Sequence, residues 1–436
     1  MNKKILQLAI PNIISNITIP LVGLADMAVT GRLESDVYIG AIALGAMIFN
    51  LIYWTFGFLR MGASGITAQA YGAKNKPEIA ATLVRGLLVG GIGAILILLL
   101  QIPIAKTAFY FIDGSQEVEH FAQSYYYIRI WAAPATISLY AFTGWFIGMQ
   151  NTKIPMLIAI VVNLLNVGLN VLFVFTFQMK SDGVALGTVI SQYIGLAMAL
   201  LFIRFKYREY FSLIKIKTLI DSSTLKNFFK VNRDIFIRTM SLLAVFTFFT
   251  SKSASANDQI LAANSLLLQF LFIFSFLTDG FAYAAEALSG KYFGARQFNK
   301  LRQSIIINFK WGAVITFIFT LIYWFGSESI LRLLTNHAEV LNEASKYTFW
   351  VTLIPIVSVA SFLWDGVFIG ITATGKMRNS MLIAVFLVFF PTWYLLAPIY
   401  ANHALWLAFF LFLLTRGLTQ TFMFKNINSK WLSDYQ

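Results

Sequence analysis

Long apolar stretches are the feature that most constrains this chain. Residues 86–100 read GLLVGGIGAILILLL and contain no charge, and comparable stretches recur along the sequence. A helix needs about 20 predominantly apolar residues to cross a bilayer. Within lipid, each backbone polar group must find its partner inside the protein, which leaves helices and closed barrels as spanning structures. Stretches of this length predict membrane-spanning helices.

The composition agrees with an all-α integral membrane protein. Of 436 residues, 58% are hydrophobic and 12% are charged, whereas soluble domains carry about 25% charged residues. The first apolar stretch lacks a small-residue cleavage site, so we expect a retained helix and not a signal peptide. The twelve predicted spans are about 6–30, 39–68, 80–109, 121–148, 155–177, 184–204, 232–251, 259–288, 303–325, 345–369, 380–400 and 403–424.

The distribution of Lys and Arg predicts the topology. With an even number of spans and both termini in the cytoplasm, 24 of the 33 basic residues fall in inside segments. Seven, including Arg129, fall outside or at outer span ends, and Arg60 and Arg416 fall within spans. The positive-inside rule therefore predicts cytoplasmic termini. We expect a multi-pass protein of the cell (inner) membrane. We expect the net charge of +14 to reflect topology and not nucleic-acid binding.

Short motifs recur 222 residues apart. Residues 71–74 read YGAK and residues 293–296 read FGAR, while residues 144–148 read GWFIG and residues 366–370 read GVFIG. In so apolar a chain, this period indicates two homologous membrane halves. Repeated halves are typical of alternating-access transporters.

The repeat predicts two pseudo-symmetric six-helix lobes, at 1–205 and 230–436. The most polar stretch, at about 206–229, is expected to be a cytoplasmic linker between them. The remaining loops leave no room for an extramembrane catalytic domain, so the chain is not expected to be an enzyme. A single chain already contains both lobes, so a monomer would suffice.

Asp26 is a carboxylate within the first predicted span. An ionised carboxylate at the bilayer centre costs roughly 2.5–3.5 kcal/mol. Burial disfavours its charged form, so a proton or Na⁺ could neutralise it reversibly. The structural alternative is a carboxylate at the helix end, exposed to outside water.

Three amides form a stripe on the fifth predicted span. Asn163, Asn166 and Asn170 follow at i, i+3 and i+7, which places them on one helix face. Thr188 in the next span could add an oxygen. With a carboxylate elsewhere in the same lobe, these groups suit a proton relay or a hard monovalent cation. Alternatively, the amides form packing contacts between helices. For Asn163 considered by itself, we favour this alternative.

The second half carries its own acidic groups. Asp279, Tyr283 and Glu286 follow at i, i+4 and i+7 on the eighth predicted span, and Asp365 lies in the tenth. Carboxylates that face a cavity would attract a cationic substrate, and an aromatic ring such as that of Tyr283 could add a cation–π contact. We therefore expect these residues to form a substrate site or a second proton site.

Other polar and proline residues have mainly structural interpretations. Asp234 precedes Arg238 by four residues, which predicts a salt bridge within one helix. Pro11 and Pro20 can bend the first span, either as a fixed kink or as a hinge that couples protonation to shape.

The sequence offers no recognisable cofactor or metal site. It has no cysteine, and its three histidines fall near span ends or in loops. We find no P-loop, no nucleophile triad and no paired catalytic acids. We expect no cofactor, no metal other than a possible Na⁺ at Asp26, and an energy source other than ATP bound by this chain.

Several long blocks resemble the DinF branch of the MATE (multidrug and toxic compound extrusion) transporters. The resemblance runs from about residue 8 to about residue 424. The blocks are LAIPNIISNITIPLVGLADMAVTGRL at 8–33, FLRMGASGITAQAYGAKN at 58–75, NRDIFIRT at 232–239, TDGFAYAAEALSGKYFGAR at 278–296, LWDGVFIG at 363–370, MRNSM at 377–381 and NHALWLA at 402–408.

The resemblance implies two six-helix bundles of the MATE/MOP type around a central cavity, and efflux of organic, often cationic or amphipathic, compounds in exchange for H⁺ or Na⁺. The family's coupling cluster in the first lobe matches Asp26, Asn166 and Thr188. Where many relatives carry an additional Asp, this chain has Asn170. That departure leaves Asp26 as the only carboxylate of the cluster and favours H⁺.

In the second lobe, the resemblance matches the acidic positions Asp279, Glu286 and Asp365. An alternative within the same superfamily is a flippase for lipid-linked precursors, which would need several intramembrane cations, whereas the sequence suggests only Arg60 and Arg416. A receptor or a membrane enzyme is an alternative from another class, but it leaves the repeat unexplained.

The polar groups do not follow the repeat. At an offset of 222, Asp26 corresponds to Phe248, and Asp365 corresponds to Thr143. We therefore predict a division of roles, in which the first lobe handles the coupling ion and the second provides the acidic wall toward the substrate.

Overall fold

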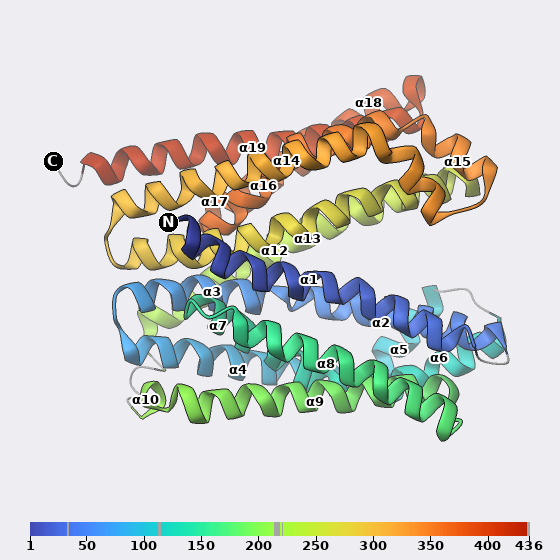
Figure 1. Ribbon diagram of the computed structural model, residues 1–436, viewed down its shortest axis with the longest axis horizontal. Helices are drawn as coiled ribbons and strands as arrows, with labels where there is room; N and C mark the ends of the chain where they lie inside the picture. The colour runs from blue at the N-terminus through green and yellow to red at the C-terminus, as the bar shows by residue number, and fades with distance from the viewer. Residues whose placement is uncertain (33–34, 112–114, 213–218, 220, 434–436) are drawn as a thin grey trace. The chain divides into compact units, whose positions relative to one another are not determined.

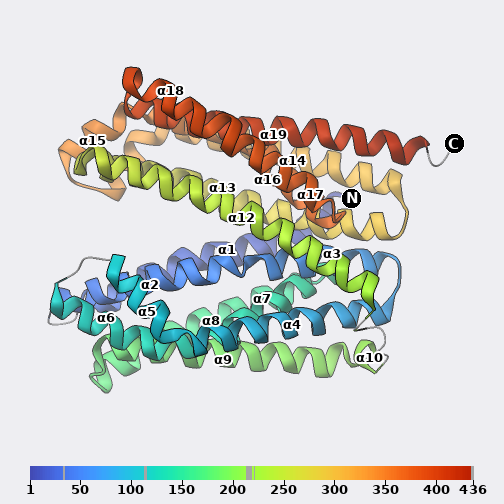
Figure 2. The same cartoon turned by 180° about the vertical axis from the view of Figure 1, so that it is seen from behind.

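The computed structural model describes residues 1–433 except 33–34, 112–114, 213–218 and 220 (Figures 1 and 2). All regular structure in these described residues is helical. Twelve stretches are long and apolar enough to cross a membrane, which confirms the all-α prediction. They are Asn2–Thr30, Asp36–Gly72, Lys76–Leu99, Gln116–Gly148, Lys153–Thr176, Lys180–Lys206, Ser222–Ala256, Asp258–Gly294, Phe298–Leu334, Thr348–Gly370, Thr374–Tyr400 and Asn402–Asn426.

The chain folds into two compact units. The first unit holds residues 14–232, and the second holds residues 1–13 together with residues 233–436. The divisions fall inside α1 (Asn2–Thr30) and α12 (Ser222–Ala256). The expected linker at 206–229 lies before the second of these divisions, and part of it, 213–218 and 220, lies outside the described residues.

The first unit begins its helices at recognisable capping residues. The Ser35 hydroxyl accepts from the Val37 N–H at 3.3 Å, and the Asn75 side chain accepts from the Glu78 N–H at 3.2 Å. Such caps satisfy N–H groups that the first helical turn leaves unpaired. Besides parts of α1 and α12, this unit contains α2 (Asp36–Thr55), α3 (Gly57–Gly72), α4 (Lys76–Leu99), α5 (Gln101–Phe111), α6 (Gln116–Arg129), α7 (Ala133–Gly148), α8 (Lys153–Val171), α9 (Lys180–Lys206) and α10 (Arg208–Phe211).

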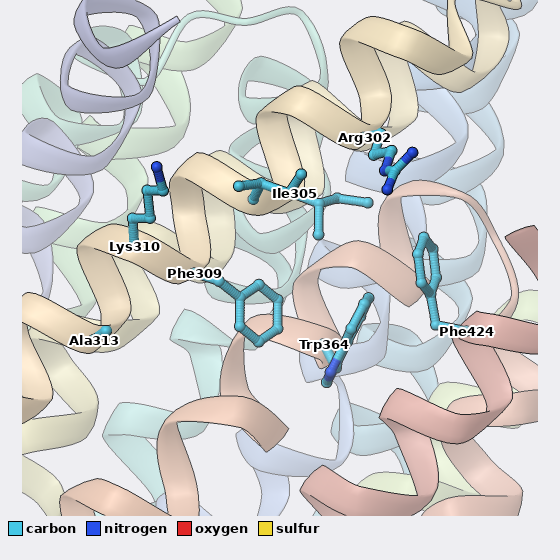
Figure 3. A pocket seen from close by; sticks show the side chains of 8 residues that line it. Arg302, Ile305, Phe309, Lys310, Ala313, Trp364 and Phe424 are labelled. Atoms are coloured by element: carbon cyan, nitrogen blue, oxygen red, sulfur yellow. The ribbon is translucent and has the colours of Figure 1, made fainter.

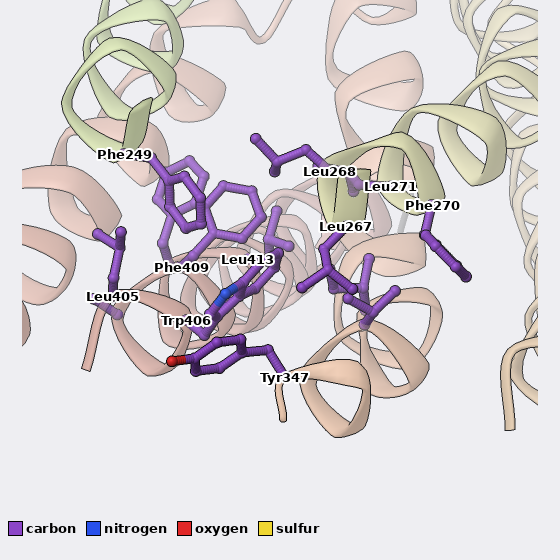
Figure 4. Packing of buried hydrophobic residues seen from close by; sticks show 14 of the residues in the cluster. Phe249, Leu267, Leu268, Phe270, Leu271, Tyr347, Leu405, Trp406, Phe409 and Leu413 are labelled. Carbon is purple, nitrogen blue, oxygen red and sulfur yellow. The ribbon is translucent and has the colours of Figure 1, made fainter. Parts of the chain in front are cut away.

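The second unit packs around a core rich in aromatic rings (Figure 4). Phe249 meets Trp406 edge to face, with ring centroids 5.0 Å apart, and also packs on Phe409. Such pairs are favoured beyond their buried area. The helices of this unit, besides parts of α1 and α12, are α13 (Asp258–Gly294), α14 (Phe298–Leu334), α15 (Ala338–Ser345), α16 (Thr348–Gly370), α17 (Thr374–Leu382), α18 (Phe390–Tyr400) and α19 (Asn402–Ser433).

The two units repeat one close helix crossing. In the first, α7 packs against α3 so closely that a Cβ on Gly144 would collide with the Arg60 carbonyl. In the second, a Cβ on Gly366 of α16 would collide with the Ala282 carbonyl of α13. Gly144 and Gly366 are 222 residues apart, and so are Arg60 and Ala282. The glycines therefore permit the same backbone approach in each half.

The helix ends repeat as well. The Asn75 N–H donates to the Ala70 carbonyl at 2.9 Å, and the Gln297 N–H donates to the Tyr292 carbonyl at 2.8 Å. In each case the preceding residue is left-handed, with φ of 55° at Lys74 and 54° at Arg296. This is the hydrogen-bond pattern of a Schellman C-cap. The two pseudo-symmetric halves are thus visible in the backbone as well as in the sequence.

Candidate functional site

A carboxylate–amide contact joins two helices of the first unit. The Nδ2 of Asn170, on α8, donates to the Oδ1 of Asp26, on α1, at 2.7 Å. Asn170 is fully buried and Asp26 is half-buried. An ionised carboxylate can only accept hydrogen bonds, so the atom of Asn170 that contacts it is the amide nitrogen. The Oδ1 of Asn170 has no hydrogen-bond partner within the described chain.

The polar cluster continues from Asn170 along α8 to α9. The Asn170 Nδ2 lies 3.4 Å from the Oδ1 of Asn166, whose Nδ2 donates to the Thr188 hydroxyl at 3.0 Å. Thr188 in turn donates to the Val184 carbonyl. Gly187 leaves room for this arrangement, because a Cβ there would collide with the Asn170 Oδ1. The four residues expected to form the coupling cluster lie together.

Asn163 belongs to the same helix stripe but has a different partner. Its Nδ2 donates to the Thr18 hydroxyl at 2.7 Å, and Thr18 donates to the Ser15 carbonyl. This contact joins α8 to α1 without reaching the carboxylate. It is the kind of helix-packing contact that the sequence favoured for Asn163.

An arginine that the sequence placed at an outer span end lies near Asp26. Arg129, at the end of α6, donates to the Tyr125 hydroxyl, and its guanidinium lies 5.0 Å from the ring centre of Phe49. Arg129 and Asp26 also interact electrostatically. Arg129 lies within the candidate span Gln116–Gly148, and its expected place toward the outer end of that span stays a prediction.

A turn of π-helix follows the amide stripe. α8 ends at Val171 and continues as a π-helical turn over Leu172–Thr176. π-helical turns are frequent at functional sites. This turn begins two residues after Asn170, so the helix that carries the cluster has an irregular end beside it.

In the second unit, two arginines bind Asp365. Both Arg238, on α12, and Arg416, on α19, donate to its Oδ2, the second at 2.8 Å, and Gln420 donates to its Oδ1 at 2.6 Å. Asp365, Arg238 and Arg416 are all buried. The sequence suggested a carboxylate facing a substrate cavity, whereas the structure gives Asp365 two cationic partners.

The acidic residues of α13 differ in their burial. Glu286 is 1% exposed, while Asp279 and Tyr283 are half-buried. Asp279 also interacts electrostatically with Arg416. The arginine pair thus has a second carboxylate nearby. The roles expected for Asp279, Tyr283 and Glu286 stay predictions.

The expected salt bridge between Asp234 and Arg238 is wrong. Arg238 binds Asp365, and Asp234 forms ion pairs with Arg378 at 2.7 Å and with the exposed Arg233 at 3.2 Å. Asp234 is 1% exposed. Spacing along one helix predicted the pair, but partners on α16 and α17 offer better contacts to each residue.

Comparison with known proteins identifies the family. The MatE family profile matches residues 11–172 and again residues 235–395. The chain belongs to the MatE family. The separate match in each half agrees with the sequence repeat.

Relatives of this MatE-family chain include the DNA damage-inducible protein F of Escherichia coli (strain K12), which is 38% identical and covers 96% of this chain and 91% of its own length. The chloroplastic Protein DETOXIFICATION 44 of Arabidopsis thaliana is 25% identical, over 95% of this chain and 80% of its own. The probable multidrug resistance protein NorM of Photorhabdus laumondii is 24% identical, over 91% and 87%. These relatives confirm the resemblance to the DinF branch of the MATE transporters.

Solved structures confirm the fold of this family. An outward-facing multidrug resistance MATE family transporter of the MOP superfamily superposes with a TM-score of 0.89 and 17% identity, covering 98% of this chain and 96% of that one. MATE in the bent conformation gives a TM-score of 0.88 at 17% identity, covering 99% and 96%. The MatE-family chain is therefore a multi-pass membrane protein with the MATE transporter fold, homologous to multidrug efflux proteins.

Proposed function

We propose that this chain is a secondary active efflux transporter of the cell (inner) membrane. It exports organic, often cationic or amphipathic, compounds in exchange for H⁺ by alternating access. The observation that carries the proposal is the Asp26 carboxylate, bound by Asn170 at 2.7 Å within a cluster of otherwise neutral amides and a hydroxyl. The bias of Lys and Arg toward the predicted cytoplasmic segments supports the orientation.

The donors around Asp26 support H⁺ over Na⁺. Hard cations prefer oxygen ligands, but Asn170 presents its amide nitrogen to the carboxylate and not its oxygen. Asp26 is also the single carboxylate of the cluster. Binding Na⁺ between these two side chains would require the amide to turn over, whereas a proton needs only the carboxylate.

Protonation of Asp26 weakens the contact between α1 and α8. A hydrogen bond to a charged group contributes about 1.5–3 kcal/mol, and one between neutral groups contributes about 1 kcal/mol. Loss of the charge therefore removes about 0.5–2 kcal/mol of helix–helix stabilisation. A shift of this size changes the populations of two states by roughly twofold to thirtyfold. In the proposed cycle, protonation from outside releases the substrate, and the return step delivers the proton to the cytoplasm.

The membrane potential limits the substrate gradient that the entry of one proton can support. One charge that moves through 100 mV supplies about 2.3 kcal/mol, which corresponds to a gradient of roughly 50-fold. Exchange of one H⁺ for one monovalent cation moves no net charge, so the pH gradient alone would drive it. Steeper transport needs a second proton site. The arginine partners of Asp365 make Glu286 the better candidate for that site.

Efflux from inside-out vesicles with an imposed pH gradient tests the proposal. We expect Asp26→Asn to reduce pH-driven export of a cationic dye to the level of vesicles without the protein. Asn163→Ala, which removes a contact of α8 that does not reach the carboxylate, should retain export. Wild-type export by Asp26→Asn would refute the proposal.

A second variant tests which ion is coupled to transport. Asn170→Asp places a second carboxylate beside Asp26, which supplies the oxygen ligands that Na⁺ prefers. We expect this variant to gain stimulation by a Na⁺ gradient, while the wild type responds to the pH gradient alone. Equal Na⁺ stimulation of both proteins would instead support Na⁺ coupling in the wild type.

A flippase for lipid-linked precursors is the second candidate function. The observation in its favour is that Arg129 and Arg238, in addition to Arg60 and Arg416, lie within candidate spans. Asp365 and Asp279 offset the charge of Arg238 and Arg416, which is why this candidate ranks second. Translocation of a polyprenyl pyrophosphate lipid in proteoliposomes, without any ion gradient, would reverse this ranking.

A further inference from the structure

A groove on the second unit combines apolar walls with two cations. It has a volume of about 540 Å³ and lies between α14, α16 and α19 (Figure 3). Its residues include two basic side chains and no carboxylate. They are Arg302, Ile305, Ile306, Phe309, Lys310, Ala313, Trp364 and Phe424.

Three aromatic rings line the groove. The ring centre of Trp364 lies 4.8 Å from that of Phe309 and 4.5 Å from that of Phe424. The Trp364 indole N–H donates to the Thr421 hydroxyl at 2.8 Å, which orients the ring. Figure 3 shows Arg302 near one end of this aromatic group and Lys310 near the other. The rings therefore form a fixed apolar surface beside α14.

The two cations are not used by the protein itself. Arg302 and Lys310 are exposed, and neither makes a hydrogen bond or an ion pair within the part of the chain that the structure describes. They lie eight residues apart on one helix face, or about 12 Å at 1.5 Å per residue. Helix side chains lean toward the helix N-terminus, so Lys310 extends toward the end of α14 where Arg302 lies.

The position in the chain predicts the leaflet. Arg302 lies in the second turn of α14, which begins at Phe298. The connection that precedes α14 carries Arg296, and the positive-inside rule assigns it to the cytoplasm. The groove would therefore open to the acyl chains of the cytoplasmic leaflet, with Arg302 at headgroup depth and the Lys310 side chain extending toward it. Basic pockets between helices on this side suit anionic headgroups.

The first unit provides an internal comparison. The positions 222 residues before Arg302 and Lys310 are Ala80 and Leu88, which carry no charge. Leu83 and Leu87, which correspond to Ile305 and Phe309, belong to the same hydrophobic cluster as Phe211 of α10. The cationic groove is thus a property of the second unit and not of the shared scaffold.

We propose that this groove binds an anionic phospholipid of the cytoplasmic leaflet. One acyl chain would pack along Phe309, Trp364 and Phe424, and the headgroup phosphate would pair with Arg302 and Lys310. The proposal does not depend on the transported substrate or on the coupling ion. It adds a lipid site to a protein whose proposed function lies elsewhere in the chain.

Native mass spectrometry of the full-length, delipidated protein tests this site, with phosphatidylglycerol as the probe and phosphatidylcholine as the neutral comparison. Each basic residue near an anionic headgroup contributes about fivefold in affinity, so Arg302→Gln with Lys310→Gln should weaken phosphatidylglycerol binding roughly 25-fold. The control, Lys300→Gln with Lys376→Gln, removes the same charge from exposed positions that do not line the groove and should change binding less than about twofold.

A second variant separates shape from charge. Ala313→Trp narrows the groove without altering any charge, and it should reduce phosphatidylglycerol binding while leaving the thermal unfolding of the protein unchanged. Equal binding of phosphatidylcholine by the wild type would overturn the proposal. So would undiminished phosphatidylglycerol binding by the groove variant, or equal losses in the groove and control variants. None of these measurements requires transport, so their failure would leave the efflux proposal intact.

Discussion

The two units share a scaffold but surround a carboxylate within a candidate span with opposite kinds of partners. Asp26 is bound by an amide, with Arg129 interacting from nearby. Asp365 is bound by two arginines and a glutamine. Neutralising the first removes a charge from a mostly neutral cluster, whereas neutralising the second leaves two cations without their shared partner. We therefore propose that the first carboxylate gains and loses a proton during the transport cycle, while the second holds helices together.

Replacing Asp365 or Asp26 with Asn should give the largest difference, which we expect in the free energy of unfolding. Asp365→Asn leaves Arg238 and Arg416 buried without a shared counter-ion, and removal of one partner from a buried pair costs about 3–5 kcal/mol. Asp26→Asn should lower the free energy of unfolding by only about 0.5–2 kcal/mol, since it exchanges a hydrogen bond to a charged group for one between neutral groups. Chemical denaturation in detergent measures both. Similar losses in the two variants would remove the distinction drawn between the units.

The shared scaffold should respond equally in both halves. Gly144→Ala and Gly366→Ala each push a Cβ into a backbone carbonyl, of Arg60 and of Ala282 respectively. Overpacking of this kind costs about 1–3 kcal/mol, and we expect the two losses to agree within about 1 kcal/mol. Thermal unfolding of the two variants provides the measurement. A large loss in one half only would show that the crossings are not equivalent.

A smaller effect separates packing amides from the coupling amide. Asn163→Ala removes one contact between helices, worth about 0.6 kcal/mol in comparable membrane proteins. Asn170→Ala removes a charge-assisted contact to Asp26 and should cost about 1.5–3 kcal/mol. Paired denaturation curves test this, and pH-driven efflux should fall only in the second variant. If Asn163→Ala impaired efflux as strongly, the whole stripe would belong to the coupling site.

The smallest effect concerns an exposed ion pair, the counterpart of the buried one at Asp365. The Lys346 ammonium donates to Glu343 at 2.6 Å, and this hydrogen bond holds the pKa of the Glu343 carboxyl below its ordinary value of 4.5. A lowered pKa contributes stability above the ordinary value, and that stability is lost as the pH falls below it. We expect Glu343→Gln to cost less than about 1 kcal/mol at pH 7. The difference from wild type should shrink as the pH falls below 4.5 and should vanish once the pH is below the lowered pKa of Glu343 in the folded protein. A difference that persisted at that pH would indicate a packing role for Glu343.

Much of the candidate site in the first unit could be predicted from local spacing. Asn166 and Asn170 share a helix face because they are one turn apart. A carboxylate within a span indicates a functional site, because an ionised carboxylate within the bilayer is energetically unfavourable. The identity of their partners could not be predicted in the same way. Arg129 and Asp26 are about a hundred residues apart in the chain, and their proximity depends on the rotation and depth of two helices.

The second unit shows the same limit more clearly. Asp234 and Arg238 have the spacing of a helix salt bridge, yet each binds a residue on another helix. Spacing reports which side chains share a face of one helix. It does not report which charges a neighbouring helix brings to that face, and in a medium of low dielectric the best-placed opposite charge prevails.

The sequence by itself determined the membrane class and the twelve spans, because only helices and closed barrels satisfy their backbone hydrogen bonds within lipid. It also determined the twofold repeat, because the same short motifs occur at the glycines and helix ends of both halves. It also indicated Asp26 and its amides, because their chemistry is rare within a span. Only the tertiary structure decided that Asp365 is shared by two arginines, that Arg129 lies near Asp26, and that two exposed cations flank an aromatic groove. Each of these depends on how separate helices are rotated and aligned, which no local pattern records.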